Sequence, residues 1–401
     1  MQETTFLLGT QNVFEYLIAQ GFCEPEEKNL SQIYPKICKN FNLLVSLPNH
    51  RHLLLKQEPH NRLGKTRGEL LKEWQIYDFI HKFPRLNPIL SIIAEAIHFD
   101  ASHSIIIFDY LHDYCDLDEF YTQEPIFPTA MVSDWPLAIA TAIGAVLATI
   151  HRTTFDCLEY KDFLSKQCAD LDHPPSPLHG LERLKPEIFA EVSADGLKFF
   201  ELYQRHASLG KAILELNKAF DACCLTHNDL KLNNILLHLE WEQILAKKEK
   251  STSPLRFIDW EKWSWGDPAF DLGTLIASYL KIWLSSLAID PEIDIETALS
   301  LATTPLEVLQ PSIIALTQSY FACFPKILSR RPDFLNRVVQ FTGLALIERI
   351  RAMVHYQEPF DNIGICMLQV AKTLLCDPQQ ALPIIFGISA SELTPAVLLP
   401  T

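Results

Sequence analysis

The sequence predicts an α+β fold with a small strand-rich N-terminal part and a larger, mainly helical C-terminal part. Two short apolar runs, 41–47 and 52–57, have the length of β-strands and flank the turn-forming Pro48-Asn49-His50. Longer apolar stretches with helical spacing dominate after residue 134. With 401 residues, 48% hydrophobic and 21% charged, the chain is long enough for two lobes with large cores.

The N-terminal part begins with a helical pattern around residues 13–18 that ends at Gly21, a usual stop signal. The runs 41–47 and 52–57 then form a probable hairpin, because turn residues separate them. The segment 69–80 repeats apolar residues near helical spacing, and 104–111 has the composition of a further strand. We therefore place a first domain at residues 1–111.

The remainder, residues 112–401, is predicted to be the helical domain. Residues 134–152 form one long buried helix, and the Pro-rich segment 170–186 forms a loop. The short strands 235–237 and 255–258 are separated by a polar stretch, 247–253, which we expect to be an exposed hairpin extension. From Asp271 onward the pattern predicts packed helices.

Charge and cysteine content restrict the partners and the compartment. A net charge of -15 disfavours nucleic acid, because an acidic surface repels phosphates. The 10 cysteines show neither zinc nor disulfide-scaffold spacing, which indicates free thiols in a reducing compartment. The N-terminus lacks a basic signal region, and the longest apolar stretch, 135–150, is shorter than a membrane span. We expect a cytoplasmic protein without a membrane partner.

One polar segment between two apolar runs carries the strongest chemical signal, and it spans residues 225–237. His227, Asp229 and Asn234 place a carboxylate and an amide on one tight loop. Phosphoryl transfer uses such a pair, since one group orients and deprotonates the acceptor hydroxyl and the other binds Mg²⁺. A second acid, Asp259, follows the apolar strand near residue 257 and could hold the metal.

These motifs resemble those of the aminoglycoside phosphotransferase/choline kinase family, a branch of the protein-kinase-like fold. The family carries H-G-D-x-x-x-x-N, then I-D-W/F-E, then G-D-P-x-x-D-L, in that order. The resemblance covers about residues 30–375 and implies a bilobal fold, with a strand-rich nucleotide-binding lobe at 1–111 and a helical lobe at 112–401 that holds the catalytic loop and acceptor site. The matching residues are His227, Asp229, Asn234, Ile258, Asp259, Trp260, Glu261, Gly266, Asp267, Pro268, Asp271 and Leu272.

The resemblance also implies a role for each residue on the catalytic side. Asp229 would be the catalytic base. Lys231 stands where this family often has histidine, and it resembles the protein-kinase lysine that neutralises the transferring phosphate. Asn234 and Asp259 would bind Mg²⁺. His227 would brace the loop. Asp271 would anchor the start of the following helix rather than take part in chemistry.

On the nucleotide side, Lys56 matches the lysine that holds the α- and β-phosphates of ATP. Its helix partner would be Glu73 rather than Glu69, which lies one turn earlier on the same face. The segment 108–111 resembles the hinge between the lobes, where backbone groups of Asp109 and Leu111 would bond adenine. His151 ends a helix that fits the family pattern, and we expect it to be a hydrogen-bonded core residue.

Two departures from the family pattern leave alternatives open. The segment 37–42, expected over the phosphates, has no glycine, and Lys39 with the Asn residues would have to compensate. A pseudokinase or nucleotide sensor is therefore the alternative to an enzyme. Lys231 resembles the lysine of protein kinases, but no D-F-G or A-P-E segment is present, which disfavours a protein kinase.

The acceptor is expected to be a small molecule with a hydroxyl group, such as an aminoglycoside, choline or a sugar. The family docks it against segments after Asp271, where side chains of both charge signs occur and give no clear choice. The three tryptophans near Asp259 could form an aromatic wall for a cation, although core packing is the more ordinary role. The acceptor-side candidates are Glu348, Arg349, Arg351, His355, Tyr356, Glu358, Asp361 and Asn362.

Overall fold

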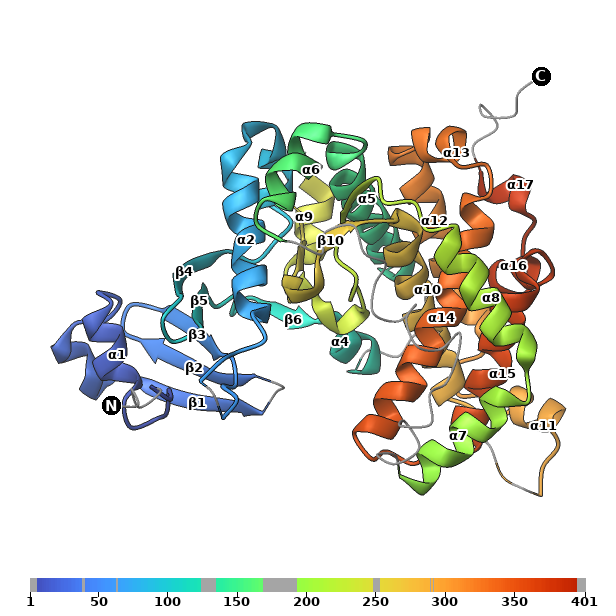
Figure 1. Ribbon diagram of the computed structural model, residues 1–401, viewed down its shortest axis with the longest axis horizontal. Helices are drawn as coiled ribbons and strands as arrows, with labels where there is room; N and C mark the ends of the chain where they lie inside the picture. The colour runs from blue at the N-terminus through green and yellow to red at the C-terminus, as the bar shows by residue number, and fades with distance from the viewer. Residues whose placement is uncertain are drawn as a thin grey trace. The chain divides into compact units, whose positions relative to one another are not determined.

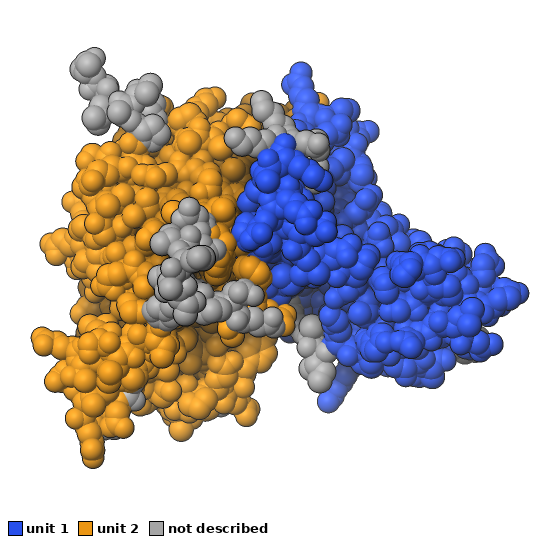
Figure 2. Space-filling view, turned by 180° about the vertical axis from the view of Figure 1, so that it is seen from behind, with its two compact units in different colours: residues 1–117, 163–169, 234–263 blue, residues 118–162, 170–233, 264–401 orange. Residues whose placement is uncertain are grey.

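The computed structural model describes residues 6–37, 40–62, 64–123, 135–168, 193–247, 253–288, 290 and 292–394. The chain forms two compact units, coloured separately in Figure 2. Unit 1 comprises residues 1–117, 163–169 and 234–263, and unit 2 comprises 118–162, 170–233 and 264–401. The predicted loop at 170–186 lies outside the described residues, as does Lys39. The α+β class is confirmed.

Unit 1 contains a five-stranded antiparallel sheet in the order β1-β2-β3-β5-β4 (Figure 1). The predicted hairpin is present, and both Asn49 and His50 in its turn have positive φ, 60° and 57°. Such a turn matches the right-handed twist of paired strands. The strands are β1 (Gln32–Ile37), β2 (Phe41–Leu47), β3 (Arg51–Gln57), β4 (Ala96–Asp100) and β5 (Ile105–Asp109).

Side-chain alternation gives this sheet two different faces. One face is apolar and packs, through residues such as Leu43 and Leu55, against the N-terminal helix α1 (Val13–Ala19) and its flanking residues. On the opposite face Lys36, Asn42 and Lys56 are aligned across three neighbouring strands, because Asn42 pairs with both lysines in the strand register. The sheet therefore buries one face as core and presents polar groups on the other.

The rest of unit 1 is built around helix α2 (Glu69–Lys82) and a second, three-stranded sheet. That sheet has the order β6-β8-β9, from β6 (Tyr114–Asp116), β8 (Ile235–His238) and β9 (Leu255–Phe257). The polar stretch 247–253, expected to be an exposed hairpin extension, lies almost entirely outside the described residues. The connection from β8 towards it contains the helix α9 (Trp241–Lys247). Short 3-10 turns complete unit 1: η1 (Pro25–Leu30), η2 (Pro84–Leu86) and η6 (Trp260–Lys262), with the short helix α3 (Asn87–Leu90).

Unit 2 is mainly helical, as predicted, with a core in which α5 packs on α12 and α14 packs on both α10 and α15 (Figure 1). A two-stranded pair, β7 (Cys224–Thr226) with β10 (Ser264–Gly266), leads into the short turn η5 (Leu232–Asn234). The remaining helices of the chain are α4 (Leu117–Gln123), α5 (Trp135–Thr154), α6 (Leu158–Ser165), α7 (Ala194–Gln204), α8 (Ala207–Lys218), α10 (Pro268–Ser285), α11 (Ile295–Ser300), α12 (Leu306–Cys323), α13 (Lys326–Arg330), α14 (Phe334–His355), α15 (Asn362–Cys376), α16 (Pro378–Phe386) and α17 (Ala390–Leu393).

Helix α5 is longer than the apolar stretch that predicted it. With 20 residues it has the length and composition of a membrane span. The prediction that this segment is too short to span a membrane was therefore wrong. More than half of its most apolar window is buried inside the protein, and it packs along α12. These contacts identify α5 as a core helix.

We predict that Gly144→Ala in α5 lowers stability, although alanine favours a helix by about 1 kcal/mol. A Cβ at Gly144 would lie 2.2 Å from the carbonyl oxygen of Leu316 in α12. Overpacking of this kind costs roughly 1–3 kcal/mol, which outweighs the gain in helix propensity. Denaturant unfolding measures the difference, with the exposed Thr141→Ala in the same helix as control. Unchanged or increased stability of Gly144→Ala would contradict the tight packing of α5 on α12.

Candidate active site

Lys56 is the centre of a buried charge cluster in unit 1. It lies near the end of β3 and is only 9% exposed. Its Nζ contacts Asp259 Oδ1 and lies 3.6 Å from Glu73 Oε2 on α2. The centroid of the Phe108 ring lies 5.0 Å from the same nitrogen. The structure therefore brings together three residues that are far apart in the sequence.

Three carboxylates act on Lys56. Burial alone would lower the pKa of Lys56, but the carboxylates of Glu73, Asp259 and Glu261 outweigh it and raise the pKa above its ordinary value. Burial raises the pKa of Glu73. The charge of Lys56 lowers this pKa, and the neighbouring acids Asp259 and Glu261 raise it further. One ammonium therefore faces several carboxylates, and this arrangement favours a further cation.

Asn234 and Asp259 lie on neighbouring backbone segments at the end of the β8–β9 pair. The carbonyl of Asn234 accepts a 3.0 Å hydrogen bond from the backbone N–H of Ile258, the residue before Asp259. Asn234 is 4% exposed, and Asp259 has φ 60° and ψ 57°, a left-handed conformation that is uncommon outside glycine. Carboxylate and amide oxygens are the ligands that Mg²⁺ prefers, so this donor set fits a magnesium ion.

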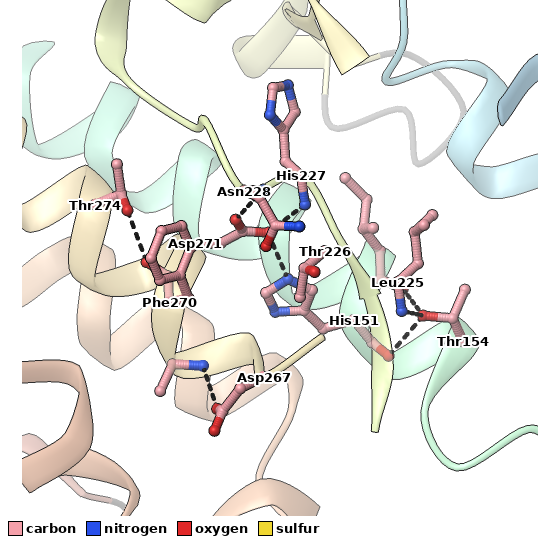
Figure 3. Close-up of polar contacts among 12 residues, drawn as sticks. His151, Thr154, Leu225, Thr226, His227, Asn228, Asp267, Phe270, Asp271 and Thr274 are labelled. Carbon is pink, nitrogen blue, oxygen red and sulfur yellow. Dashed lines mark hydrogen bonds and ion pairs between the residues drawn. The ribbon is translucent and has the colours of Figure 1, made fainter. Parts of the chain in front are cut away.

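The loop that carries Asp229, in unit 2, is held by one buried carboxylate (Figure 3). Asp271 accepts hydrogen bonds from the backbone N–H groups of His227 and Asn228, at 2.7 and 2.8 Å. His151 Nε2 lies 3.2 Å from the same carboxylate, and its Nδ1 lies 2.9 Å from the Tyr320 hydroxyl. His151 is fully buried, which confirms its expected role as a hydrogen-bonded core residue.

The expected role of Asp271 at the start of its own helix is wrong. Asp267 caps α10, because its side chain accepts the backbone N–H of Ala269 at 3.0 Å. Asp271 lies one turn further along the helix and points to the loop instead (Figure 3). The sequence spacing alone did not distinguish the two acids, since both precede an apolar helix.

Asp229 is positioned by the same loop. Its backbone N–H donates to His227 Nδ1 at 3.3 Å, so the imidazole braces the turn. Lys231 Nζ lies 3.1 Å from Asp229 Oδ1, and the side chain of Asp229 is 22% exposed. Asn228 stands where the family has glycine, and its φ of 63° explains why, because glycine and asparagine tolerate this conformation best.

The predicted adenine segment continues the strand β5, which ends at Asp109. The N–H of the next residue, Tyr110, donates to the His52 carbonyl of β3 at 2.8 Å. Successive backbone groups of a strand point to opposite sides, so those of Asp109 point away from β3. Leu111 lies beyond the strand, and its carbonyl accepts the backbone N–H of Tyr114 at 3.3 Å.

Two asparagines on the polar face of the sheet are nine-tenths buried. Asn40 and Asn42 are each 8% exposed, and among the described residues their side-chain oxygens have no hydrogen-bond partner. Asn42 lies directly across from Lys56 in the strand register. Asn42 Oδ1, a hydrogen-bond acceptor, is therefore the unpartnered group that the register places across from Lys56.

The other aromatic and charged candidates have structural surroundings. Trp260, Trp263 and Trp265 are all buried, which confirms core packing. Arg349 pairs with Glu358 at 2.8 Å and Arg351 with Glu348 at 2.6 Å. Asp361 caps α15 by accepting two backbone N–H groups. Ion pairing and capping thus account for several acceptor-side candidates.

Known structures resemble the chain over most of its length. An ethanolamine kinase from Plasmodium vivax has a TM-score of 0.52 at 14% identity, covering 96% of this chain and 92% of its own. A choline/ethanolamine kinase family protein from Mesorhizobium loti has a TM-score of 0.47 at 13% identity, covering 93% and 99%. A choline kinase from Streptococcus pneumoniae has a TM-score of 0.40 at 16% identity, covering 90% and 98%.

The first of these structures supports the predicted protein-kinase-like fold. No curated protein sequence matches the chain. The sequence model of the phosphotransferase enzyme family matches residues 40–294, which is well over half of the chain and includes every motif residue from Lys56 to Asp271. The chain therefore belongs to the phosphotransferase enzyme family.

Proposed function

We propose that this phosphotransferase moves the γ-phosphoryl group of MgATP to a hydroxyl group of a small molecule. The observation that carries the proposal is the buried Lys56, which contacts Glu73 and Asp259 and whose pKa the Glu261 carboxylate also raises. A lysine in this setting suits the phosphates of a nucleotide, and the acids suit the metal that accompanies them.

In unit 1, Lys56 binds the α- and β-phosphates, and Glu73 holds the ammonium in place. Asn234 and Asp259 hold Mg²⁺, which when bound neutralises charge on the phosphates. Asp259 contacts Lys56 in the structure. A Mg²⁺ ion bound to Asp259 would neutralise this carboxylate, so that the Lys56 ammonium could pair with the phosphates instead. Residues 1–111 serve as the nucleotide-binding lobe in this assignment.

Two further groups complete the proposed nucleotide contacts. The backbone of Asp109 and Leu111 bonds adenine, since the intervening Tyr110 N–H already bonds β3. Asn40 and Asn42 stand in the glycine-free segment, and the N–H groups of their carboxamides are donors of the kind that phosphate oxygens accept.

In unit 2, Asp229 orients the acceptor hydroxyl and accepts its proton as the new bond forms. Lys231 lies close enough to Asp229 to place a positive charge beside the transferring group. Asp271 and His227 hold the loop in the required conformation, so Asp229 does not need to reorganise during the reaction.

The acceptor is an aminoglycoside-, choline-, ethanolamine- or sugar-like alcohol. The nine cysteines in the described part of the chain are all free thiols, which suits a reducing compartment such as the cytoplasm.

A nucleotide-sensing module without catalysis is the second candidate, favoured by the missing glycines at 37–42. A protein kinase is a weaker alternative that rests on Lys231.

The deciding experiment measures transfer of γ-³²P from MgATP to a panel of small alcohols, a cell extract of metabolites and a generic protein substrate. Labelled small molecules support the proposal. MgATP binding without any labelled product would favour the sensor, and labelled protein alone would favour a protein kinase. Absence of MgATP binding would overturn both the enzyme and the sensor.

We predict that Asp229→Asn lowers turnover by about 10²- to 10⁴-fold, the usual contribution of a general base, and leaves MgATP affinity unchanged. The carboxamide keeps the shape of the side chain but accepts no proton. Steady-state kinetics and calorimetry on the same preparation separate the two effects. The control is Asn233→Ala, an exposed residue on the same loop, which should keep full activity. Near-normal turnover by Asp229→Asn would rule out this residue as the base.

We predict that Asp259→Asn weakens MgATP binding by about 10- to 100-fold, as expected for the loss of about 1.5–3 kcal/mol from a charged contact. Asparagine tolerates the left-handed backbone at this position, so the fold should persist. Calorimetry measures the affinity. The control is Glu242→Ala, an exposed acid on α9 of the same unit. Equal affinity in the wild type and Asp259→Asn would contradict the metal assignment.

A further inference from the structure

Glu58 is a buried acid, just after β3, that the proposed chemistry does not use. It is 1% exposed. Its Oε2 accepts hydrogen bonds from the backbone N–H of Leu70, at 3.4 Å, and from the Ser104 hydroxyl, at 3.2 Å. Its own N–H donates to the Ser104 carbonyl at 3.1 Å. One side chain thus joins the end of β3, the β4–β5 turn and the start of α2.

The helix end that Glu58 contacts needs an external partner. The first N–H groups of a helix have no acceptor within the helix, and a negative charge there is favourable. Helix α2 begins after Gly68, which has φ 80° and supplies no side-chain cap. Leu70 is the second residue of this helix, so the Glu58 carboxylate acts as a cap supplied by another element.

Glu58 and Lys56 hold the same helix at two points. They are two residues apart, so in an extended chain their side chains lie on the same side. Glu58 contacts Leu70, and Lys56 contacts Glu73, one turn further along α2. The other contacts of α2 with the sheet include rings, Trp74 with Phe99 and Tyr77 with Phe108, which restrain sliding less than a directed hydrogen bond.

We propose that Glu58 is a positioning residue that fixes the start of α2 and thereby places the Glu73 carboxylate against Lys56. The inference rests on the proposed function, because it assigns the Lys56–Glu73 pair to nucleotide binding. Glu58 itself touches neither nucleotide nor metal in this assignment. Its effect on MgATP must therefore pass through Glu73.

The test compares Glu58→Ala and Glu58→Gln, each made alone and in a Glu73→Gln background. Calorimetry gives MgATP affinity, and hydrogen exchange gives the protection of residues 69–73. We expect Glu58→Ala to weaken MgATP binding by about fivefold or more, as expected for coupled neighbouring residues, and to speed exchange in this first turn. Glu58→Gln keeps an acceptor oxygen for the Leu70 N–H and should show a smaller effect.

The background variant identifies the route of the effect. If Glu58 acts through Glu73, then Glu58→Ala adds no further loss of MgATP affinity to Glu73→Gln. The matched control is Gln57→Ala, the adjacent buried residue, which instead bonds Leu8, Phe6 and His103 backbone groups. It should lower the melting temperature without changing MgATP affinity or exchange at residues 69–73.

Different results would overturn the positioning role of Glu58 and the proposed function. MgATP affinity unchanged in Glu58→Ala, or reduced by the same factor in both backgrounds, would overturn the positioning role. If the wild type binds no MgATP, the proposed function fails. Hydrogen exchange then still decides whether Glu58 fixes the start of α2, and unchanged protection in both Glu58 variants would overturn that as well.

Discussion

The structure of unit 1 depends on a buried ammonium, that of Lys56, among several carboxylates. A buried charge is costly unless it is paired, so β3, α2 and the segment after β9 must meet where Lys56 lies. Glu73 and Asp259 pair with the lysine, and the Glu261 carboxylate also raises its pKa. We propose that these acids favour a cation together with phosphates at this place.

In unit 2 a buried charged group also holds the loop that carries Asp229. The Asp271 carboxylate, 1% exposed, accepts two backbone N–H groups of the loop and is itself held by His151. A buried acid satisfied by backbone donors is rigid, because releasing it would leave several polar groups without partners. In unit 1, the Glu58 carboxylate likewise accepts a backbone N–H, that of Leu70 at the start of α2. Asp271 thus holds the loop that carries Asp229, and we propose that Glu58 holds the start of α2 in the same way.

The sequence was sufficient for elements with long or regular patterns. The hairpin at 41–57, helix α2 and the helices after Asp271 are present, and the Lys56 and Glu73 side chains meet as the resemblance implied. Strands β1 and β4 were missed. Both lie at the edges of the sheet, β1 contains Pro35 and is largely exposed, and β4 has only 5 residues without clear alternation. The partners of Asp271 and Glu58 were also missed. Those contacts join segments distant in the sequence or depend on backbone N–H groups, which residue types do not reveal.

We propose that the acids around Lys56 require a metal ion before phosphates bind beside them. Calorimetric titration of the wild type with ATP, in the presence and in the absence of Mg²⁺, measures this requirement. We expect ATP to bind at least about tenfold more tightly with Mg²⁺, because the metal-free nucleotide meets unneutralised carboxylates. Equal affinity with and without Mg²⁺ would show that these acids do not need a metal ion.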